Sequence, residues 1–243
     1  VQRTKEKKER IREYLEKHSD ESGIIYCATR KNVDELYLFL ESAGFSVGRY
    51  HAGMGNEARK SSQEDFIYDR IQVMIATNAF GMGIDKSNVR YVLHYNMPQS
   101  LENYYQETGR AGRDGGEGMC ITFYSNKDLQ KLEKFMQGKP VAEQEIGKQL
   151  LIETAAYAES SICRRKLLLH YFGEEYTEDN CGNCDNCLNP KKQVEAQDLL
   201  CAVLETMVAG KEKFKAEVII DILNGKETAE IKSYHLEELE MFG

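Results

Sequence analysis

The sequence lacks the features that would assign a protein to the membrane or to the secretory pathway. No stretch approaches the run of about 18 apolar residues that a membrane-spanning helix needs. Residues 1–18 are charged and contain no apolar signal core. The chain also has no initiator Met. We therefore expect a piece excised from a longer protein that has no membrane contact and is located in the cytoplasm.

The phosphate-binding loop of nucleotide hydrolases, G-x-x-x-x-G-K-[ST], is also absent. Gly-Lys pairs occur at 138–139, 147–148, 210–211 and 225–226, but without the second glycine and the hydroxyl at the required places. No DEAH-like carboxylate motif for magnesium is found either. The phosphate cradle and the magnesium ligands of an ATPase are therefore not on this chain.

An excess of positive charge is lacking as well. The chain has 32 Lys and Arg against 40 Asp and Glu, a net charge of −8, which argues against a polycation that coats nucleic acid. A local basic groove on an acidic body remains compatible with this balance. With 243 residues, 41% hydrophobic and 30% charged, the chain has the composition of a globular protein with one large or two modest domains.

Seven cysteines are present, but nothing indicates a disulfide framework. The number is odd and no secretion signal precedes the chain. Cys27 and Cys120 lie in apolar, strand-like runs, and Cys201 lies in a helical pattern. We expect these three to be small core residues.

The other four cysteines form the sharpest metal-binding pattern in the chain. Cys163, Cys181, Cys184 and Cys187 have the spacing C-x17-C-x2-C-x2-C, which can close a tetrahedron of thiolates around zinc. Free cysteines and an iron–sulfur cluster are the alternatives. The ferredoxin pattern needs a further cysteine four residues on, and position 191 is Lys. A four-cysteine site leaves no open coordination position, so we predict a structural zinc.

Apolar runs and helical patterns alternate over the first 137 residues. Strands are predicted at 23–28, 46–50, 72–77, 89–95 and 118–124, and helices at 4–17, 32–42, 56–69, 100–110 and 126–137, with Ser100 as an N-cap. Such alternation indicates an α/β fold, a parallel sheet with helices on both faces. A helical connection at 141–172 and helices at 194–209, 214–225 and 228–239 are predicted to follow.

Polar loop segments cluster where the predicted strands end. The segments TRK, YHAG, TNAFGMG and GRAGR all fall at or beside the carboxyl ends of strands, where ligands bind to open parallel sheets. In the last segment Arg110 and Arg113 stand three residues apart between glycines, on one helix face or its frayed end. The guanidinium fork matches phosphate oxygens. Two arginines alone are more typical of a solvated helix end than of a phosphate site.

The sequence of the whole stretch 72–118 favours the phosphate site over the solvated helix end. ATNAFGMGIDK (76–86) and YYQETGRAGRDG (104–115) resemble the fifth and sixth motifs of superfamily 2 helicases, specifically those of the RecQ family of DNA helicases. The segment CRRKLLLHYFGE…CGNCDNC resembles the zinc-binding subdomain of that family. The resemblance covers nearly the whole chain.

The resemblance implies a three-part organisation. Residues 1–137 would be the second RecA-like helicase lobe, 138–190 a helical zinc-binding subdomain, and 191–243 a truncated winged-helix domain. The parent would be an ATP-dependent DNA helicase that moves 3′ to 5′ in repair and recombination. ATP and Mg²⁺ would be held mainly by a preceding RecA-like lobe, so we expect this chain alone to be catalytically inactive.

The resemblance also implies roles for individual residues. Arg113 would be the arginine finger, Arg110 its neighbour on the phosphates, and Gln106 a link between ATP and DNA. Gly83 and Asp85 would lie on the nucleotide side. The residues expected to contact DNA are Thr29, Arg30, Lys31, His51, Gly53, Thr77 and Asn78. A histidine at the position of His51 is, by itself, more often a local turn partner than a DNA ligand.

The implied partners are single-stranded and forked DNA and the preceding lobe, with the protein monomeric and associated with the bacterial nucleoid. One alternative is a non-catalytic, zinc-stabilised DNA-binding or docking module, in which the arginines only bind phosphates. Another is an RNA helicase, because the lobe is shared across superfamily 2; the zinc segment argues against it.

Overall fold

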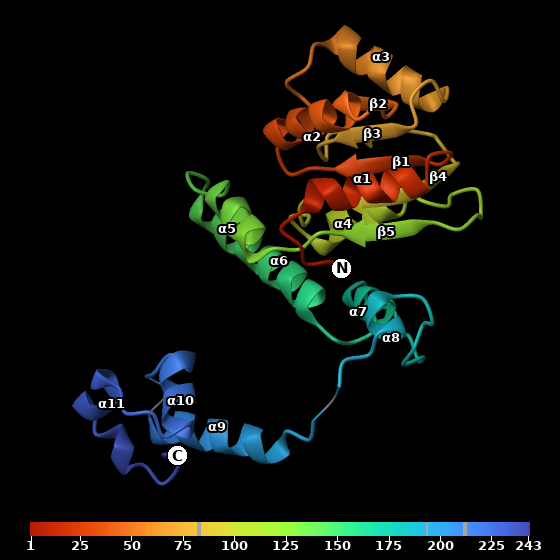
Figure 1. Ribbon diagram of the computed structural model, residues 1–243. Coiled ribbons are helices and arrows are strands. Elements are labelled where there is room, and N and C mark those ends of the chain that lie inside the picture. Colours follow the sequence, from red (N-terminus) through yellow and green to blue (C-terminus); the bar gives the residue numbers. More distant parts are fainter. Residues whose placement is uncertain (82–83, 193, 211–212) are drawn as a thin grey trace. The chain divides into compact units, whose positions relative to one another are not determined.

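The computed structural model describes residues 1–81, 84–192, 194–210 and 213–243. Its compact units are Val1–Pro190 and Lys191–Gly243, and each is described by itself (Figure 1). The first unit carries a parallel sheet and the candidate sites. The predicted boundary between a lobe and a zinc-binding subdomain at residue 137 lies inside this unit and stays a prediction.

The sheet of the first unit has five parallel strands. These are β1 (Ser22–Tyr26), β2 (Val47–Tyr50), β3 (Val73–Ala76), β4 (Val89–His94) and β5 (Met119–Thr122), in the order β2-β3-β1-β4-β5. Central strand β1 pairs with β3 on one side and with β4 on the other. The predicted parallel α/β fold is confirmed (Figure 1).

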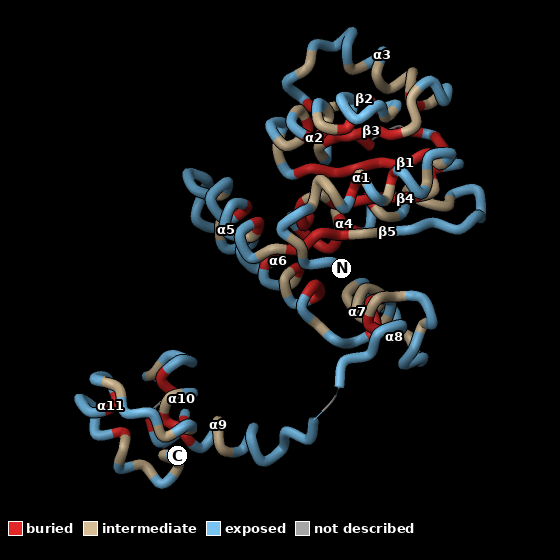
Figure 2. Tube along the Cα trace, viewed as in Figure 1, coloured by how far each residue is buried: buried red, intermediate tan, exposed pale blue. Residues whose placement is uncertain are grey.

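Helices cover both faces of this sheet, as predicted. Alternate residues of a strand point to opposite faces. Ile25 of β1 packs in one buried cluster with side chains of α1 (Lys7–Lys17) and α2 (Arg30–Ser42). Its neighbour Ile24 packs in a second cluster with Phe66 of α3 (Asn56–Ile67). The central strands β1, β3 and β4 are consequently the most deeply buried part of the unit (Figure 2).

The helix predicted at 100–110 is α4 and spans Leu101–Thr108. The hydroxyl of Ser100 accepts a hydrogen bond from Asn103 N at 3.2 Å, which confirms the predicted N-cap. Turns follow Gly109, and Gly112 has a φ of +71°, a conformation that ends a right-handed helix. Arg110 and Arg113 therefore lie beyond the helix end and not on a regular helix face.

A helical segment follows the sheet. It consists of α5 (Asn126–Lys134), α6 (Val141–Glu159), α7 (Arg164–Tyr171) and α8 (Asp185–Leu188). The predicted connection at 141–172 is broken between α6 and α7, directly before Cys163, because the chain must turn there to bring this cysteine to the later three. No helix in the described part of the chain is long and apolar enough to cross a membrane.

The second unit contains short helices. These are α9 (Gln197–Ala209), α10 (Ala216–Leu223), α11 (Ala229–Ser233) and the 3₁₀ turn η1 (Leu236–Glu238). Its core holds Val218, Ile222, Ile231 and Leu236. No residue of α9 belongs to that core, and Cys201 is exposed, so its predicted place as a core residue is wrong. In the first unit Cys27 is buried as predicted, and Cys120 is half-buried.

Candidate functional site and metal centre

The candidate site lies along the sheet edge at which the strands end. All strands are parallel, so the loops after them meet at one edge. Backbone hydrogen bonds join neighbouring loops: Thr77 N donates to Tyr50 O at 3.1 Å. Ala28 N donates to the side-chain oxygen of Asn96 at 3.2 Å. The structure thus brings the predicted segments 28–31, 50–53 and 77–81 to one edge.

The segment Thr29–Lys31 forms the start of α2. The Thr29 hydroxyl accepts a hydrogen bond from Asn32 N at 3.0 Å and caps the helix. Arg30 is exposed and lies against Gly53, where an added Cβ would be 3.1 Å from Arg30 Cδ. The Lys31 side chain is 84% exposed, with a surface ion pair to Glu35 at 3.7 Å. Two cations therefore stand at the edge, one of them beside the glycine loop.

His51 is buried next to that loop. Its Nε2 lies 3.2 Å from the Asp34 carboxylate, and its Nδ1 accepts a hydrogen bond from Gly53 N at 3.1 Å. The same carboxylate binds Arg49 at 2.5 Å. These contacts agree with the alternative interpretation of the sequence, in which His51 is a local turn partner. His51 shapes the backbone around Gly53, and a direct contact with DNA stays a prediction.

Arg110 and Arg113 both pack against the loop after β3. An added Cβ on Gly81 would lie 2.3 Å from Arg110 Nη2, so the guanidinium is directly against that backbone. The Nε atom of Arg110 is buried without a hydrogen-bond partner among the described residues. Arg113 is exposed, and it donates to Gly109 O at 3.2 Å and to Ile84 O at 3.5 Å. Two guanidinium groups therefore converge beside this loop.

Four other predicted residues lie on α4 or on the loop after β3. Gln106 and Asp85 are exposed, as is Asn78, and Thr77 is half-buried at the end of β3. Gly83, predicted on the nucleotide side, lies outside the described residues. The convergence of arginines next to exposed polar groups gives a surface that can bind phosphates.

A buried polar chain behind the arginines was not anticipated from the sequence. His94, which ends β4, lies 2.8 Å from Glu107 of α4 through Nε2. Tyr26, which ends β1, stacks on His94 with ring centroids 5.6 Å apart and donates to Phe80 O at 3.1 Å. Burial raises the pKa of Tyr26, so its hydroxyl stays protonated and able to donate. The polar side chains that end the apolar strands β1 and β4 were the available signal in the sequence.

These contacts anchor α4 to the sheet. Tyr26, His94 and Glu107 are all buried, and a cavity of about 50 Å³ lies beside them at the sheet edge. Glu107 stands three residues before Arg110. Because α4 has only eight residues, its position depends on such tertiary contacts rather than on helix propensity. The placement of Arg110 therefore follows from the placement of α4.

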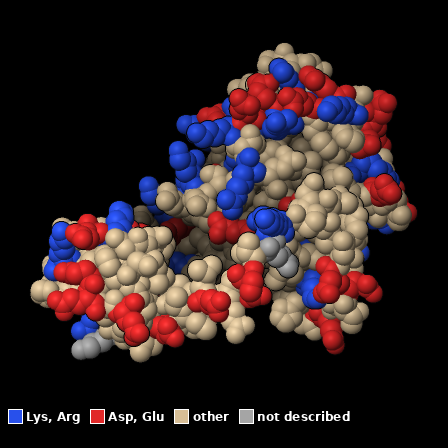
Figure 3. Space-filling model, turned by 60° about the horizontal axis from the view of Figure 1, so that its bottom comes forward, with Lys and Arg blue, Asp and Glu red and all other residues tan. Residues whose placement is uncertain are grey.

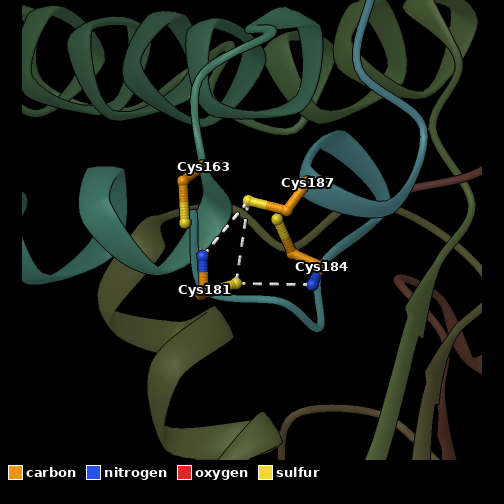
Figure 4. Close-up of side chains that lie close together, drawn as sticks. All are labelled: Cys163, Cys181, Cys184 and Cys187. Atoms are coloured by element: carbon orange, nitrogen blue, oxygen red, sulfur yellow. Dashed lines mark hydrogen bonds between the residues drawn. The ribbon is translucent and has the colours of Figure 1, made fainter. Parts of the chain in front are cut away.

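The four predicted metal ligands come together in a second centre. The sulfur atoms of Cys163, Cys181, Cys184 and Cys187 all lie within 4.8 Å of one another, and they point toward one another (Figure 4). The Cys181 and Cys187 sulfurs are 3.9 Å apart. Zinc–sulfur bonds of about 2.3 Å in a tetrahedron would put sulfurs about 3.8 Å apart. The residues present fit a structural zinc.

Backbone amides donate hydrogen bonds to three of the four sulfurs. Arg164 N donates to Cys184 Sγ, Cys181 N to Cys187 Sγ, and Cys184 N to Cys181 Sγ, each at 3.4 Å. Burial raises the pKa of the Cys181 thiol, but hydrogen bonds from the backbone at Asn183 and Cys184 and from the Cys163 and Cys184 side chains bring that pKa down to about 6. Four adjacent thiolates repel one another, so a cation is needed to hold them together.

Arg164 secures the loop that carries the last ligands. It is 9% exposed, and it binds both carboxylate oxygens of Asp185, through Nε at 3.0 Å and Nη2 at 3.1 Å. Lys166 binds Asp179 at 2.6 Å. Two of the basic residues that follow Cys163 therefore pair with acidic side chains of the same zinc-binding region.

Sequence comparisons divide the chain among three family models. The helicase conserved C-terminal domain matches residues 6–115, the RecQ zinc-binding region matches 126–188, and the RQC domain matches 190–243. The first match contains the sheet edge with both arginines, and the second contains all four cysteines. These findings define the carboxy-terminal lobe of a helicase followed by a zinc-binding region.

Individual relatives make the assignment more specific. ATP-dependent DNA helicase RecQ of Haemophilus influenzae is 39% identical over 236 residues, 97% of this chain and 38% of that protein. The protein of the same name from Bacillus subtilis is 37% identical over 235 residues, 96% of this chain and 39% of that protein. The chain belongs to the RecQ family, and it spans less than two fifths of the length of these curated relatives.

Among solved structures, the C-terminal domain of the DEAD-box protein Dbp5 is similar. It is 26% identical, with a TM-score of 0.47, and the match covers 60% of this chain and 92% of that one.

Proposed function

We propose that the chain is the C-terminal portion of an ATP-dependent DNA helicase that moves 3′ to 5′. The observation that carries this proposal is the convergence of Arg110 and Arg113 beside Gly81, at the sheet edge where parallel α/β folds bind ligands. The RecQ family membership and the names of the relatives support it. In the parent, ATP would bind between this edge and a preceding RecA-like lobe, which would hold most of the nucleotide and its Mg²⁺.

In this proposal the arginines supply positive charge to the transferring phosphoryl group. Arg113 is exposed, and among the described residues its hydrogen bonds go to the carbonyl oxygens of Gly109 and Ile84, so it can exchange them for phosphate oxygens. A supplied arginine is worth about 10³–10⁵ in rate in phosphoryl transfer. Arg110 would bind the neighbouring phosphate oxygens. Gln106, exposed on α4, would link the nucleotide to the DNA-binding loops.

The DNA strand would lie along the loops of the same edge. Arg30 and Lys31 would bind backbone phosphates, and the loops at Gly53, Thr77 and Asn78 would approach the strand closely. Basic and acidic side chains are interspersed over the face shown in Figure 3, so attraction would come from local groups and not from the overall charge. Closure of the two lobes on ATP and their opening after hydrolysis would move the strand.

We propose single-stranded and forked DNA as substrates, a monomeric parent, and a role in repair and recombination at the bacterial nucleoid in the cytoplasm. The zinc would be structural, held by Cys163, Cys181, Cys184 and Cys187, and it would take no part in phosphoryl transfer.

A non-catalytic DNA-binding module is the second candidate. The observation that favours it is the resting contact of Arg113 with Gly109 O and Ile84 O, which a simple phosphate clamp would also show. This candidate makes a different prediction, because removal of Arg113 would then weaken DNA binding and leave hydrolysis unaffected.

The test is DNA-stimulated ATP hydrolysis by the longer protein that includes the preceding lobe. We expect Arg113→Ala to reduce kcat by about 10³-fold or more, with nucleotide and DNA binding retained. Arg113→Lys should rescue little, because an ammonium lacks the planar fork. Arg70→Ala, which removes an exposed arginine paired with Asp65, is the matched control and should leave kcat unchanged. Unchanged turnover in Arg113→Ala would establish the binding module instead.

A further inference from the structure

Helix α4 touches the zinc-binding region through a pair of buried tyrosines. Tyr104 of α4 and Tyr157 of α6 have ring centroids 5.3 Å apart, and the Tyr157 hydroxyl donates to the Tyr104 hydroxyl at 3.5 Å. Both side chains are buried in one cluster with Leu101. Burial raises the pKa of Tyr157, so the hydroxyl stays protonated. A direct contact therefore exists between the arginine-bearing end of the lobe and α6.

Tyr157 is in turn held by the residue next to the first metal ligand. The guanidinium of Arg164 lies over the Tyr157 ring, 5.4 Å from its centroid, and its Nη1 donates to Tyr157 O. The same guanidinium binds Asp185, and the Arg164 backbone N–H donates to Cys184 Sγ. One arginine thus contacts both the tyrosine and the ligand loop.

A second residue of the ligand loop reaches the same end of α6. Asn186, between Asp185 and Cys187, donates through its side-chain nitrogen to Ser160 O at 2.9 Å and to Ile162 O at 2.7 Å. Asn186 is itself buried. The loop that carries Cys184 and Cys187 is therefore joined to the end of α6 at two points, through Arg164 and through Asn186.

At its other end this chain of contacts reaches Arg110. Tyr104 and Glu107 stand one turn apart on α4, and Glu107 is bound to buried His94. Arg110 follows Glu107 by three residues and packs on Gly81. A shift of the two-turn helix α4 would move the guanidinium away from this backbone.

We propose that Tyr157 is a positioning residue that couples metal occupancy of the four-cysteine site to the placement of α4 and of Arg110. Metal binding fixes the loop of Cys184 and Cys187, which holds the end of α6, and the Tyr157 ring holds Tyr104. The consequence for phosphoryl transfer depends on the function proposed above, whereas the mechanical coupling does not.

The coupling is tested by hydrogen exchange on the 243-residue chain. In the wild type, removal of zinc with a chelator should raise the exchange rates of the α4 amides, residues 104–109, about 2- to 30-fold, the range of known coupling energies. Rates in β1 and β3 should stay the same. Tyr157→Leu with zinc bound should already show the faster α4 exchange, and chelation should then add less than about twofold.

Two further variants control this measurement. Tyr157→Phe keeps the ring and should restore most of the wild-type response. Tyr37→Leu removes a tyrosine of α2 whose hydroxyl donates to Glu41, and this variant should respond to chelation as the wild type does. The proposal is overturned if Tyr157→Leu responds to chelation as the wild type does, or if exchange in β1 and β3 rises in parallel with α4.

A second experiment, ATP hydrolysis by the longer protein, distinguishes a failure of the coupling from a failure of the proposed function. In the longer protein, Tyr157→Leu should lower kcat for ATP and leave the nucleotide KM nearly unchanged, because Arg110 acts in the transition state. If α4 exchange responds as expected and kcat does not change, the coupling stands and the proposed role of the arginines is wrong. If kcat falls without any change in α4 exchange, the positioning role of Tyr157 is wrong.

Discussion

At the scale of single residues, Gly81 leaves the space that the Arg110 guanidinium occupies because glycine has no side chain. Its φ is +153°, and an added Cβ would lie 2.3 Å from Arg110 Nη2 and 2.7 Å from Arg110 Cζ. Gly81→Ala should therefore push the guanidinium out of place. A misplacement of about 1 Å can cost about 10²-fold in rate, and we expect a loss of kcat of that order in the longer protein.

The matched control for this substitution is Gly55→Ala. Gly55 has a φ of −60°, and an added Cβ there would meet no atom within 4 Å. Steady-state ATP hydrolysis of both variants, with thermal unfolding to confirm folding, measures the difference. Equal kcat values for the two variants would show that the contact of Arg110 with Gly81 is not needed.

At the scale of elements, the turns around α7 and α8 depend on their metal. The two helices have eight and four residues, too few to be stable by themselves. Cys184→Ser should reduce bound zinc from one per chain to well below one, and it should increase proteolysis between residues 160 and 190. Metal analysis and limited proteolysis measure both effects.

Cys201→Ser is the control for the zinc ligands. Cys201 is exposed on α9 and is not part of the sulfur cluster, so its substitution should leave the zinc content at one per chain. The wild-type protein should be colourless. A brown protein that contains iron would refute the zinc assignment, and so would full zinc retention in Cys184→Ser.

At the scale of the whole molecule, the proposed function requires this chain to supply one side of a two-sided nucleotide site. It contributes guanidinium groups at a sheet edge, and its sequence has no phosphate loop and no DEAH-like carboxylate motif. We expect ATP hydrolysis by the 243-residue chain to be at background, with or without DNA. Addition of the preceding lobe in one polypeptide should restore it. Robust turnover by the chain alone would disprove the proposal that a preceding lobe holds most of the nucleotide and its Mg²⁺.

Periodicity and spacing determined much of the fold and of the metal site in advance. Short apolar runs alternating with helical patterns predicted the parallel sheet because strands buried on both faces are apolar throughout. The cysteine spacing predicted the zinc centre because ligands with two residues between them in a tight turn can share one ion. The N-cap at Ser100 was predictable for a similar reason, since a cap is a local contact.

Only the tertiary structure decided which polar residues meet. His94 and Glu107 are 13 positions apart, and Tyr104 and Tyr157 are 53 apart, and no local pattern pairs them. The exposure of Cys201 likewise depends on where the core of its unit lies. Sequence by itself determined the elements, the metal ligands and the arginine motif, because these depend on neighbours in the chain. The contacts that position Arg110 depend on packing between distant segments, and the fold alone brings those segments together.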